Sequence, residues 1–162
     1  MDTNFKHKWN LWFHNIRDVW TIEGYKKIYS IETIREYWKL YNNWDKIGTI
    51  NNKHFFLMRE GISPIWEDEK NKNGGCWSFK ITEANSQELC NDLSKYLITE
   101  SLSSVENDIV GISACLKKNN FSVIKIWNVN SSNNNINLLN KDILDKWGMD
   151  IIYIAHMPEL NV

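Results

Sequence analysis

Short runs that alternate between apolar and polar residues recur along the chain and predict strands. These runs lie at residues 8–14, 18–29, 54–59, 76–81, 109–117, 123–129 and 150–155, and the second contains an irregular stretch at 20–24. Three other segments repeat apolar residues every three or four positions and predict helices at 33–41, 86–98 and 142–147. The resulting order, ββαββαββαβ, favours an antiparallel sheet with helices on one face. The other face must then meet solvent or a ligand.

Residues that can cap a helix mark the ends of these segments. Thr33 followed by Glu36 forms a capping box, in which each side chain can bond to the other residue's backbone N–H. We expect Asn85 to cap the second helix and Gly148 to end the third. In the first helix, one face carries Ile34, Tyr37, Trp38 and Tyr41. In the second helix, the inward face carries Leu89, Leu93, Tyr96 and Leu97.

The composition fits one domain spanning residues 1–162. Hydrophobic residues make up 43% of the chain, enough for a single packed core, and the charged fraction of 24% is ordinary. The formal net charge is −1, whereas a protein that holds nucleic acid mainly by neutralising phosphates is basic. Any nucleic-acid binding must therefore depend on a local pocket.

The cysteines and the chain's first residues bear on its compartment. Cys76, Cys90 and Cys115 are odd in number, and their spacing fits neither a zinc site nor a disulfide framework. The first ten residues hold no apolar signal core, and no apolar run is long enough to cross a membrane. We therefore expect a cytoplasmic protein with reduced thiols and no membrane association.

Several enzyme signatures are missing from the sequence: the Walker A loop, GxSxG, HExxH and CxxC. The four histidines are scattered along the chain and indicate surface or strand positions rather than metal ligands: His7, His14, His54 and His156. We expect a binding protein that is not an enzyme and that uses no cofactor or metal.

The strongest local signal is the segment PIWEDEKNK at residues 64–72, where a tryptophan directly precedes three carboxylates. One interpretation is a solvated charged loop with Trp66 packed inward. The other is a site for a nucleic-acid base, because an indole offers a stacking face and a carboxylate can accept the N–H donors of guanine.

Segments along most of the chain share their order and spacing with a known family. These segments are WNLWF at 9–13, Trp20, TIREYWKLYN at 33–42, GISPIWEDEKNK at 61–72, Gly74-Gly75 with Trp77, Glu100-Ser101, Gly111 and Ile126-Trp127. They resemble the eukaryotic translation initiation factor 4E family, which binds the 7-methylguanosine cap of messenger RNA. The resemblance implies a curved antiparallel sheet with three helices on its convex face and the cap pocket on its concave face.

The resemblance also implies roles for individual residues. Trp20 and Trp66 would stack on the methylated base, Glu67 would accept the N1 and N2 protons of guanine, and Trp127 would lie beside the N7-methyl group. These roles suit the ligand, because methylation at N7 makes the base cationic and a tryptophan face attracts a cation. A cationic base also strengthens its hydrogen bond to a carboxylate.

The family places basic residues around the cap phosphates, and this sequence departs from that pattern. Cys76 and Ser122 or Val123 occupy basic positions of the family, whereas Lys117 falls on a family arginine. Strand alternation offers Lys125, which lies two residues before the tryptophan of the Ile-Trp pair and so points to the same face. Lys118 is a third candidate, although alternation directs it to the opposite face.

On the back of the fold, Ile34 and Trp38 match the family's docking site for the short helical motif of initiation factor 4G and its competitors. Asn91 and Lys95 stand where the family has leucines, which favours weaker docking or a different partner. We expect a monomer whose partners are capped messenger RNA and such a scaffold.

The sequence supports four hypotheses about function. The first is a cap-binding factor that recruits the scaffold, and the second is a cap-binding protein without recruitment that represses translation or protects the cap. The third is a cap hydrolase using Glu67, Asp68 and Glu69 on a metal ion, although adjacent carboxylates in a loop seldom converge on one metal. The fourth is a carbohydrate-binding module with tryptophan platforms, which does not account for the order of the motifs.

Overall fold

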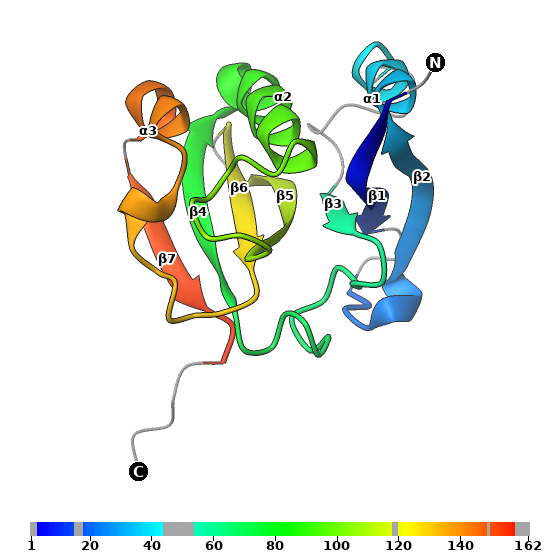
Figure 1. Ribbon diagram of the computed structural model, residues 1–162. Helices are drawn as coiled ribbons and strands as arrows, with labels where there is room; N and C mark the ends of the chain where they lie inside the picture. Colours follow the sequence, from blue (N-terminus) through cyan, green and yellow to red (C-terminus); the bar gives the residue numbers. More distant parts are fainter. Residues whose placement is uncertain (1–2, 15–17, 44–53, 118–119, 149, 158–162) are drawn as a thin grey trace.

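The computed structural model describes residues 3–14, 18–43, 54–117, 120–148 and 150–157 (Figure 1). Its elements are β1 (Asn4–His14), a 3-10 turn η1 (Ile22–Gly24), β2 (Tyr25–Thr33), α1 (Ile34–Tyr41), β3 (Phe55–Arg59), β4 (Gly75–Thr82), α2 (Glu83–Ile98), β5 (Ile109–Lys117), β6 (Phe121–Asn128), a 3-10 turn η3 (Ile136–Leu138), α3 (Lys141–Trp147) and β7 (Ile151–Ala155). The predicted order of strands and helices is confirmed.

The strands form one antiparallel sheet in the order β2-β1-β3-β5-β6-β4-β7. Figure 1 shows α1, α2 and α3 on the same side of this sheet. The main core lies between that side and the helices, where Leu89 and Leu93 of α2 pack with Trp77 and Phe79 of β4. The predicted antiparallel sheet with helices on one face is therefore confirmed. We call the side of the sheet away from the helices the open face.

The helix ends test the capping predictions. The capping box is confirmed, because Glu36 N donates to Thr33 Oγ1 at 3.2 Å and Thr33 N donates to Glu36 Oε1 at 3.1 Å. Gly148 ends α3, and its N–H donates to Leu144 O at 2.8 Å. The prediction that Asn85 caps the second helix is wrong. The helix begins at Glu83, directly after β4, and Glu83 N donates to Asn120 O at 2.8 Å.

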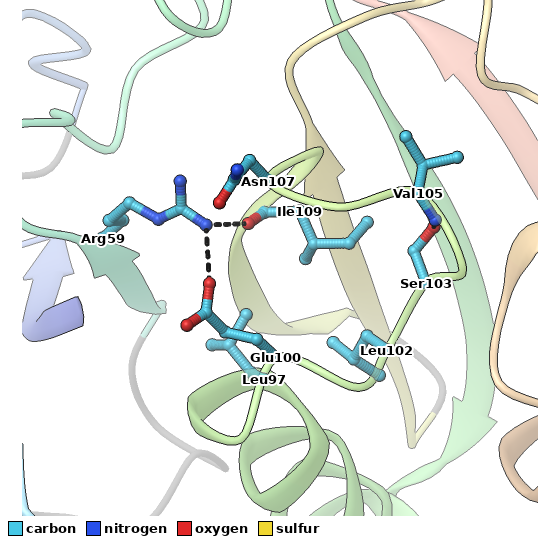
Figure 2. Close-up of a pocket in the computed structure, with 8 residues that line it drawn as sticks. All are labelled: Arg59, Leu97, Glu100, Leu102, Ser103, Val105, Asn107 and Ile109. Atoms are coloured by element: carbon cyan, nitrogen blue, oxygen red, sulfur yellow. Dashed lines mark hydrogen bonds and ion pairs between the residues drawn. The ribbon is translucent and has the colours of Figure 1, made fainter. Parts of the chain in front are cut away.

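An ion cluster ties the end of β3 to the turn after α2, at one edge of the core (Figure 2). Arg59 Nη2 lies 3.4 Å from Glu100 Oε1 and donates to Ile109 O at 3.1 Å. His7 Nδ1 lies 2.9 Å from the same carboxylate oxygen, and the Arg59 guanidinium lies 5.5 Å from the ring centroid of Trp9. Glu100 has a φ of 56°, so its backbone turns the chain out of the helix while its side chain bonds back to the sheet.

We predict that Glu100→Gln lowers the free energy of unfolding by about 1–3 kcal/mol, because it removes the negative charge that faces a half-buried guanidinium. Equilibrium unfolding in urea measures this. The matched control is Glu106→Gln, whose carboxylate pairs with Lys6 at 3.1 Å on the exposed surface and should matter by at most about 1 kcal/mol. Equal effects of the two variants would contradict a structural role for the Glu100 cluster.

Candidate functional site

Two rows of directly paired residues cross all seven strands on the open face. The first row is Lys27, Trp12, Phe56, Ser113, Lys125, Ser78 and Ile152. The second row is Ser30, Asn10, Met58, Gly111, Trp127, Cys76 and Ile154. Directly opposite residues of an antiparallel ladder share a face, so each row is a line of side chains across the sheet.

A pocket of about 200 Å³ opens where the middle of these rows meets two loops. Its lining is mostly aromatic: Trp20, Tyr25, His54, Phe56, Pro64, Ile65, Trp66, Glu67, Ser113, Lys125 and Trp127. The four residues predicted to hold a base therefore share one pocket, together with Lys125. Tyr25, His54 and Phe56 also line the pocket, although no motif in the sequence marked them as lining residues.

Trp127 forms a fixed part of the pocket floor. Its ring is buried, its Nε1 donates to Ser113 Oγ at 3.0 Å, and the rings of Phe56 and His156 lie 6.0 Å and 4.9 Å from it. Gly111 lies opposite it on β5, where a Cβ would come within 2.7 Å of the backbone oxygen of Leu57. The floor therefore needs glycine at that position.

Trp20 stands at the rim, with 56% of its surface exposed. Its ring stacks on the imidazole of His14, with centroids 4.0 Å apart and planes 11° from parallel. His14 Nε2 lies 2.7 Å from Val19 O, and because a carbonyl can only accept, this nitrogen donates. The stack holds the indole at the pocket while much of its surface stays available to a ligand.

The loop carrying Trp66 and Glu67 is anchored by the residues that follow them. The Asp68 carboxylate accepts from Ser63 N and Lys70 N, both at 2.9 Å. The buried Asn71 amide donates to Ser63 O at 2.9 Å and to Ile65 O at 2.8 Å. Trp66 itself is 47% exposed, so the interpretation that it packs inward is wrong.

The charged side chains at or near the pocket include the Glu67 carboxylate and the lysines Lys117 and Lys125. Burial and the Glu67 carboxylate together raise the pKa of Tyr25 to about 12, which indicates that Glu67 acts on this side of the pocket. Burial, Lys117, His14 and Lys125 lower the pKa of His54 to about 3. Burial and Lys125 lower the pKa of His156 to about 4. Both imidazoles are therefore neutral at pH 7.

The three lysines that were predicted to bind the cap phosphates differ in their position relative to the pocket. Lys125 lines the pocket, whereas Lys117 acts on His54 without lining it, and Lys118 lies outside the described residues. Cys76, at a basic position of the family, is buried with its Sγ 3.6 Å from His156 Nε2.

A further lysine that was not predicted, Lys80, is exposed and pairs with Val123 on the open face. Its Nζ lies 4.7 Å from the ring centroid of Phe121. The alternation that identified Lys125 could have found it, because Trp77 and Phe79 point inward and Lys80 therefore points outward.

On the helix-covered side, Trp38 of α1 is 45% exposed, and Ile34 is exposed beside it. The Trp38 ring meets Tyr41 edge-on at 5.1 Å, and Lys95 Nζ lies 5.1 Å from the Tyr41 ring centroid. Asn91 accepts a hydrogen bond from Gln87 Nε2 at 3.0 Å. This side therefore combines an aromatic patch with a polar border on α2.

Within the described ranges, no group of three or more histidine, cysteine, aspartate or glutamate side chains could hold a metal ion. Both oxygens of the Asp68 carboxylate bond to backbone N–H groups, which leaves Asp68 in a structural role. None of the helices in the described part of the chain is long and apolar enough to cross a membrane.

Comparison with known proteins yields one family. The model described as Eukaryotic initiation factor 4E matches residues 4–157. Eukaryotic translation initiation factor 4E of Xenopus laevis is 31% identical over 115 residues, covering 65% of this chain and 53% of that protein. Eukaryotic translation initiation factor 4E-2 of Schizosaccharomyces pombe is 29% identical over 149 residues, covering 89% and 58%. The chain thus spans a little over half the length of these curated relatives.

Solved structures share the fold. The eIF4E-3 of C. elegans, in complex with the 4E-binding protein Mextli and a cap analog, has a TM-score of 0.82 at 21% identity, covering 96% of this chain and 94% of that chain. Ascaris suum eIF4E-3 with an m2,2,7G cap has a TM-score of 0.81 at 23% identity, covering 100% and 96%.

We predict that Asn71→Ala loosens the loop that carries Trp66 and Glu67 by about 1–3 kcal/mol, because the partly buried carbonyls of Ser63 and Ile65 each lose a side-chain donor. Hydrogen exchange of the Asp68 and Asn71 amides should accelerate. Asn73→Ala, which changes an exposed asparagine in the same loop, is the control and should leave those rates unchanged. Unaltered exchange in Asn71→Ala would show that the loop does not depend on this side chain.

Proposed function

The chain belongs to the eukaryotic initiation factor 4E family, and on this premise we propose that it binds the 7-methylguanosine cap of messenger RNA in the pocket between Trp20 and Trp66. The observation that carries the proposal is the convergence of two exposed indoles, the Glu67 carboxylate and Trp127 in one pocket. A solved relative from A. suum is in complex with an m7G cap, which supports the same class of ligand.

The chemistry of the pocket suits a cationic base. Trp20 and Trp66 stack on its two faces, which contributes about 1–3 kcal/mol per stacked base, and the positive charge adds about 0.5–2 kcal/mol. Glu67 accepts the N1 and N2 protons in charge-assisted hydrogen bonds. Trp127 lies beside the N7-methyl group. Because His54 and His156 are neutral at pH 7, they do not repel the cationic base.

We expect the phosphates of the cap to lie beside the lysines near the pocket. Lys125 extends from the pocket lining, and Lys117 lies near His54. Lys80 shares the open face, two residue pairs along the β4–β6 ladder from Lys125. On a chain with a net charge of −1, these lysines supply local attraction for a triphosphate without a general affinity for nucleic acid.

We further propose that the Trp38 surface receives a helical motif from an initiation scaffold or from a competing protein, which places the protein in translation initiation. An exposed tryptophan beside an exposed isoleucine is the kind of patch that forms an interface hot spot. The alternative is cap binding without scaffold recruitment, and Asn91 and Lys95 favour it because they replace apolar contact area with polar groups. A structure of a C. elegans relative with the 4E-binding protein Mextli supports the first reading.

The test of cap binding is a fluorescence titration with m7GTP and with unmethylated GTP. Wild type should bind m7GTP far more tightly than GTP, and Glu67→Gln should weaken m7GTP binding about 10- to 100-fold, since it removes a charged hydrogen-bond acceptor. Glu69→Gln, two residues along the same loop, is the matched control and should bind like wild type. Equal binding of m7GTP by both variants would overturn the assignment of Glu67.

A second test concerns the back surface. Trp38→Ala should lower the free energy of unfolding by less than about 1 kcal/mol, because nearly half of this side chain is already exposed, and should leave m7GTP binding unchanged. Trp77→Ala, which empties a buried position, should cost about 3–5 kcal/mol by the same measurement. A helical peptide with the tyrosine–leucine motif of factor 4G should bind wild type and not Trp38→Ala. Absence of peptide binding by wild type would favour the alternative without recruitment.

A further inference from the structure

We propose that His14 is a positioning residue for the base stack, and that the charge on its imidazole sets how strongly the pocket prefers a methylated, cationic guanine over a neutral one. This proposal rests on the proposed function, because it takes the cap base to stack on Trp20. It adds a determinant of selectivity that lies behind the pocket wall and is not one of the lining residues.

His14 covers one face of the Trp20 indole. The two ring centroids are 4.0 Å apart, and the ring planes are 11° from parallel. Trp20 nevertheless keeps 56% of its surface exposed. Because an indole has only two faces, a base that stacks on Trp20 must use the face that His14 leaves open. The imidazole, the indole and the base then form a stack of three flat rings with the indole in the middle.

Contacts from three other segments fix the imidazole in this stack. His14 pairs with Tyr25 of β2, and their ring centroids are 4.9 Å apart. The backbone N of His14 donates to His54 O at 2.9 Å, and its Nε2 donates to Val19 O at 2.7 Å. An imidazolium keeps the Nε2 proton and gains a second one at Nδ1. Protonation therefore changes the charge of the ring and leaves the hydrogen bond to Val19 in place.

An imidazolium at this position opposes the binding of a cationic base. A tryptophan face attracts a cation, and here two cations would share one indole from opposite sides. A base stacked about 3.5–4 Å from the indole lies about 8 Å from the imidazole. Two unit charges at that separation repel by an amount that corresponds to about two- to thirtyfold in affinity, depending on the local dielectric. Unmethylated guanine is neutral and escapes this repulsion.

The titratable groups around His14 keep their charge over the pH range in which a histidine side chain ordinarily changes its own, between about 5 and 8. Burial raises the pKa of Tyr25 to about 12, so its hydroxyl stays neutral. Burial lowers the pKa of His54 to about 3, so this ring also stays neutral. In η1, a hydrogen bond with Thr21 lowers the pKa of Glu23, which stays ionised. His14 is therefore the group beside Trp20 that can change the charge on the stack.

The experiment measures the affinities of m7GTP and GTP by fluorescence titration at pH 7.5 and 5.5 and follows their ratio. The ratio removes the attraction of the triphosphate, which both ligands carry. His14→Phe keeps a flat ring on Trp20 but cannot become charged, and His14→Leu removes the flat ring. The control is His7→Gln, which removes a histidine at the other end of β1. A change in the charge of Glu67 or of the base is common to all four proteins.

We expect the preference of wild type and of His7→Gln for m7GTP to fall between pH 7.5 and 5.5 by about two- to thirtyfold more than that of His14→Phe. At pH 7.5, His14→Phe should keep the wild-type affinity for m7GTP within about twofold, because the phenyl ring also stacks on Trp20. His14→Leu should bind m7GTP about two- to tenfold more weakly at both pH values, because Trp20 loses its aromatic partner.

Different results overturn the two parts of the proposal. The same pH dependence of the ratio in wild type and in His14→Phe would overturn the role of the charge. Wild-type affinity of His14→Leu for m7GTP would overturn the positioning role. Melting temperatures at both pH values check the fold of each variant, and His14→Tyr supplies a second uncharged ring if His14→Phe does not fold. If wild type at pH 7.5 does not prefer m7GTP over GTP, the proposed function itself fails, before any variant is compared.

Discussion

The two-residue alternation of the antiparallel ladder is the constraint on which the core and the candidate site both depend. In β6, Ile124 and Ile126 are fully buried under the helices, whereas Lys125 and Trp127 line the pocket on the open face. A slip of one residue in the pairing would bury the lysine and expose both isoleucines. The packing of the core selects the register of the strands, and the same register fixes which side chains form the pocket floor. It also fixes the row of residues that runs from Trp127 across β4 to β7.

The pocket joins this rigid floor to two walls that come from loops. A hydrogen bond to Ser113 fixes Trp127, stacking on His14 supports Trp20, and the buried amide of Asn71 holds the segment before Trp66. All three contacts join residues of the chain itself, so walls held in this way would need less ordering on ligand binding, and more of the stacking energy would remain as affinity.

Local patterns in the sequence predicted most of the fold, because alternation and helical periodicity are properties of neighbouring residues. The prediction failed at Asn85, where a hydrogen bond from Glu83 N to Asn120, far along the chain, starts the helix earlier. The roles of Trp20, Trp66, Glu67 and Trp127 came from the family resemblance. Tyr25, His54 and Phe56 were missed because their place in the pocket depends on strand pairing, which no single segment encodes.

The tryptophans in the described part of the chain differ in how much of their surface is exposed. Trp9 and Trp77 are almost fully buried in the main core, where large apolar groups stabilise a small domain. Trp20, Trp66 and Trp38 each keep about half of their surface in contact with solvent, although an exposed indole gains little from the hydrophobic effect. Trp20 and Trp66 line the same pocket on the open face, and Trp38 lies on α1 on the other side of the sheet. The sheet core thus separates the two proposed binding surfaces, so a ligand in the pocket and a partner on α1 would not compete for the same side chains.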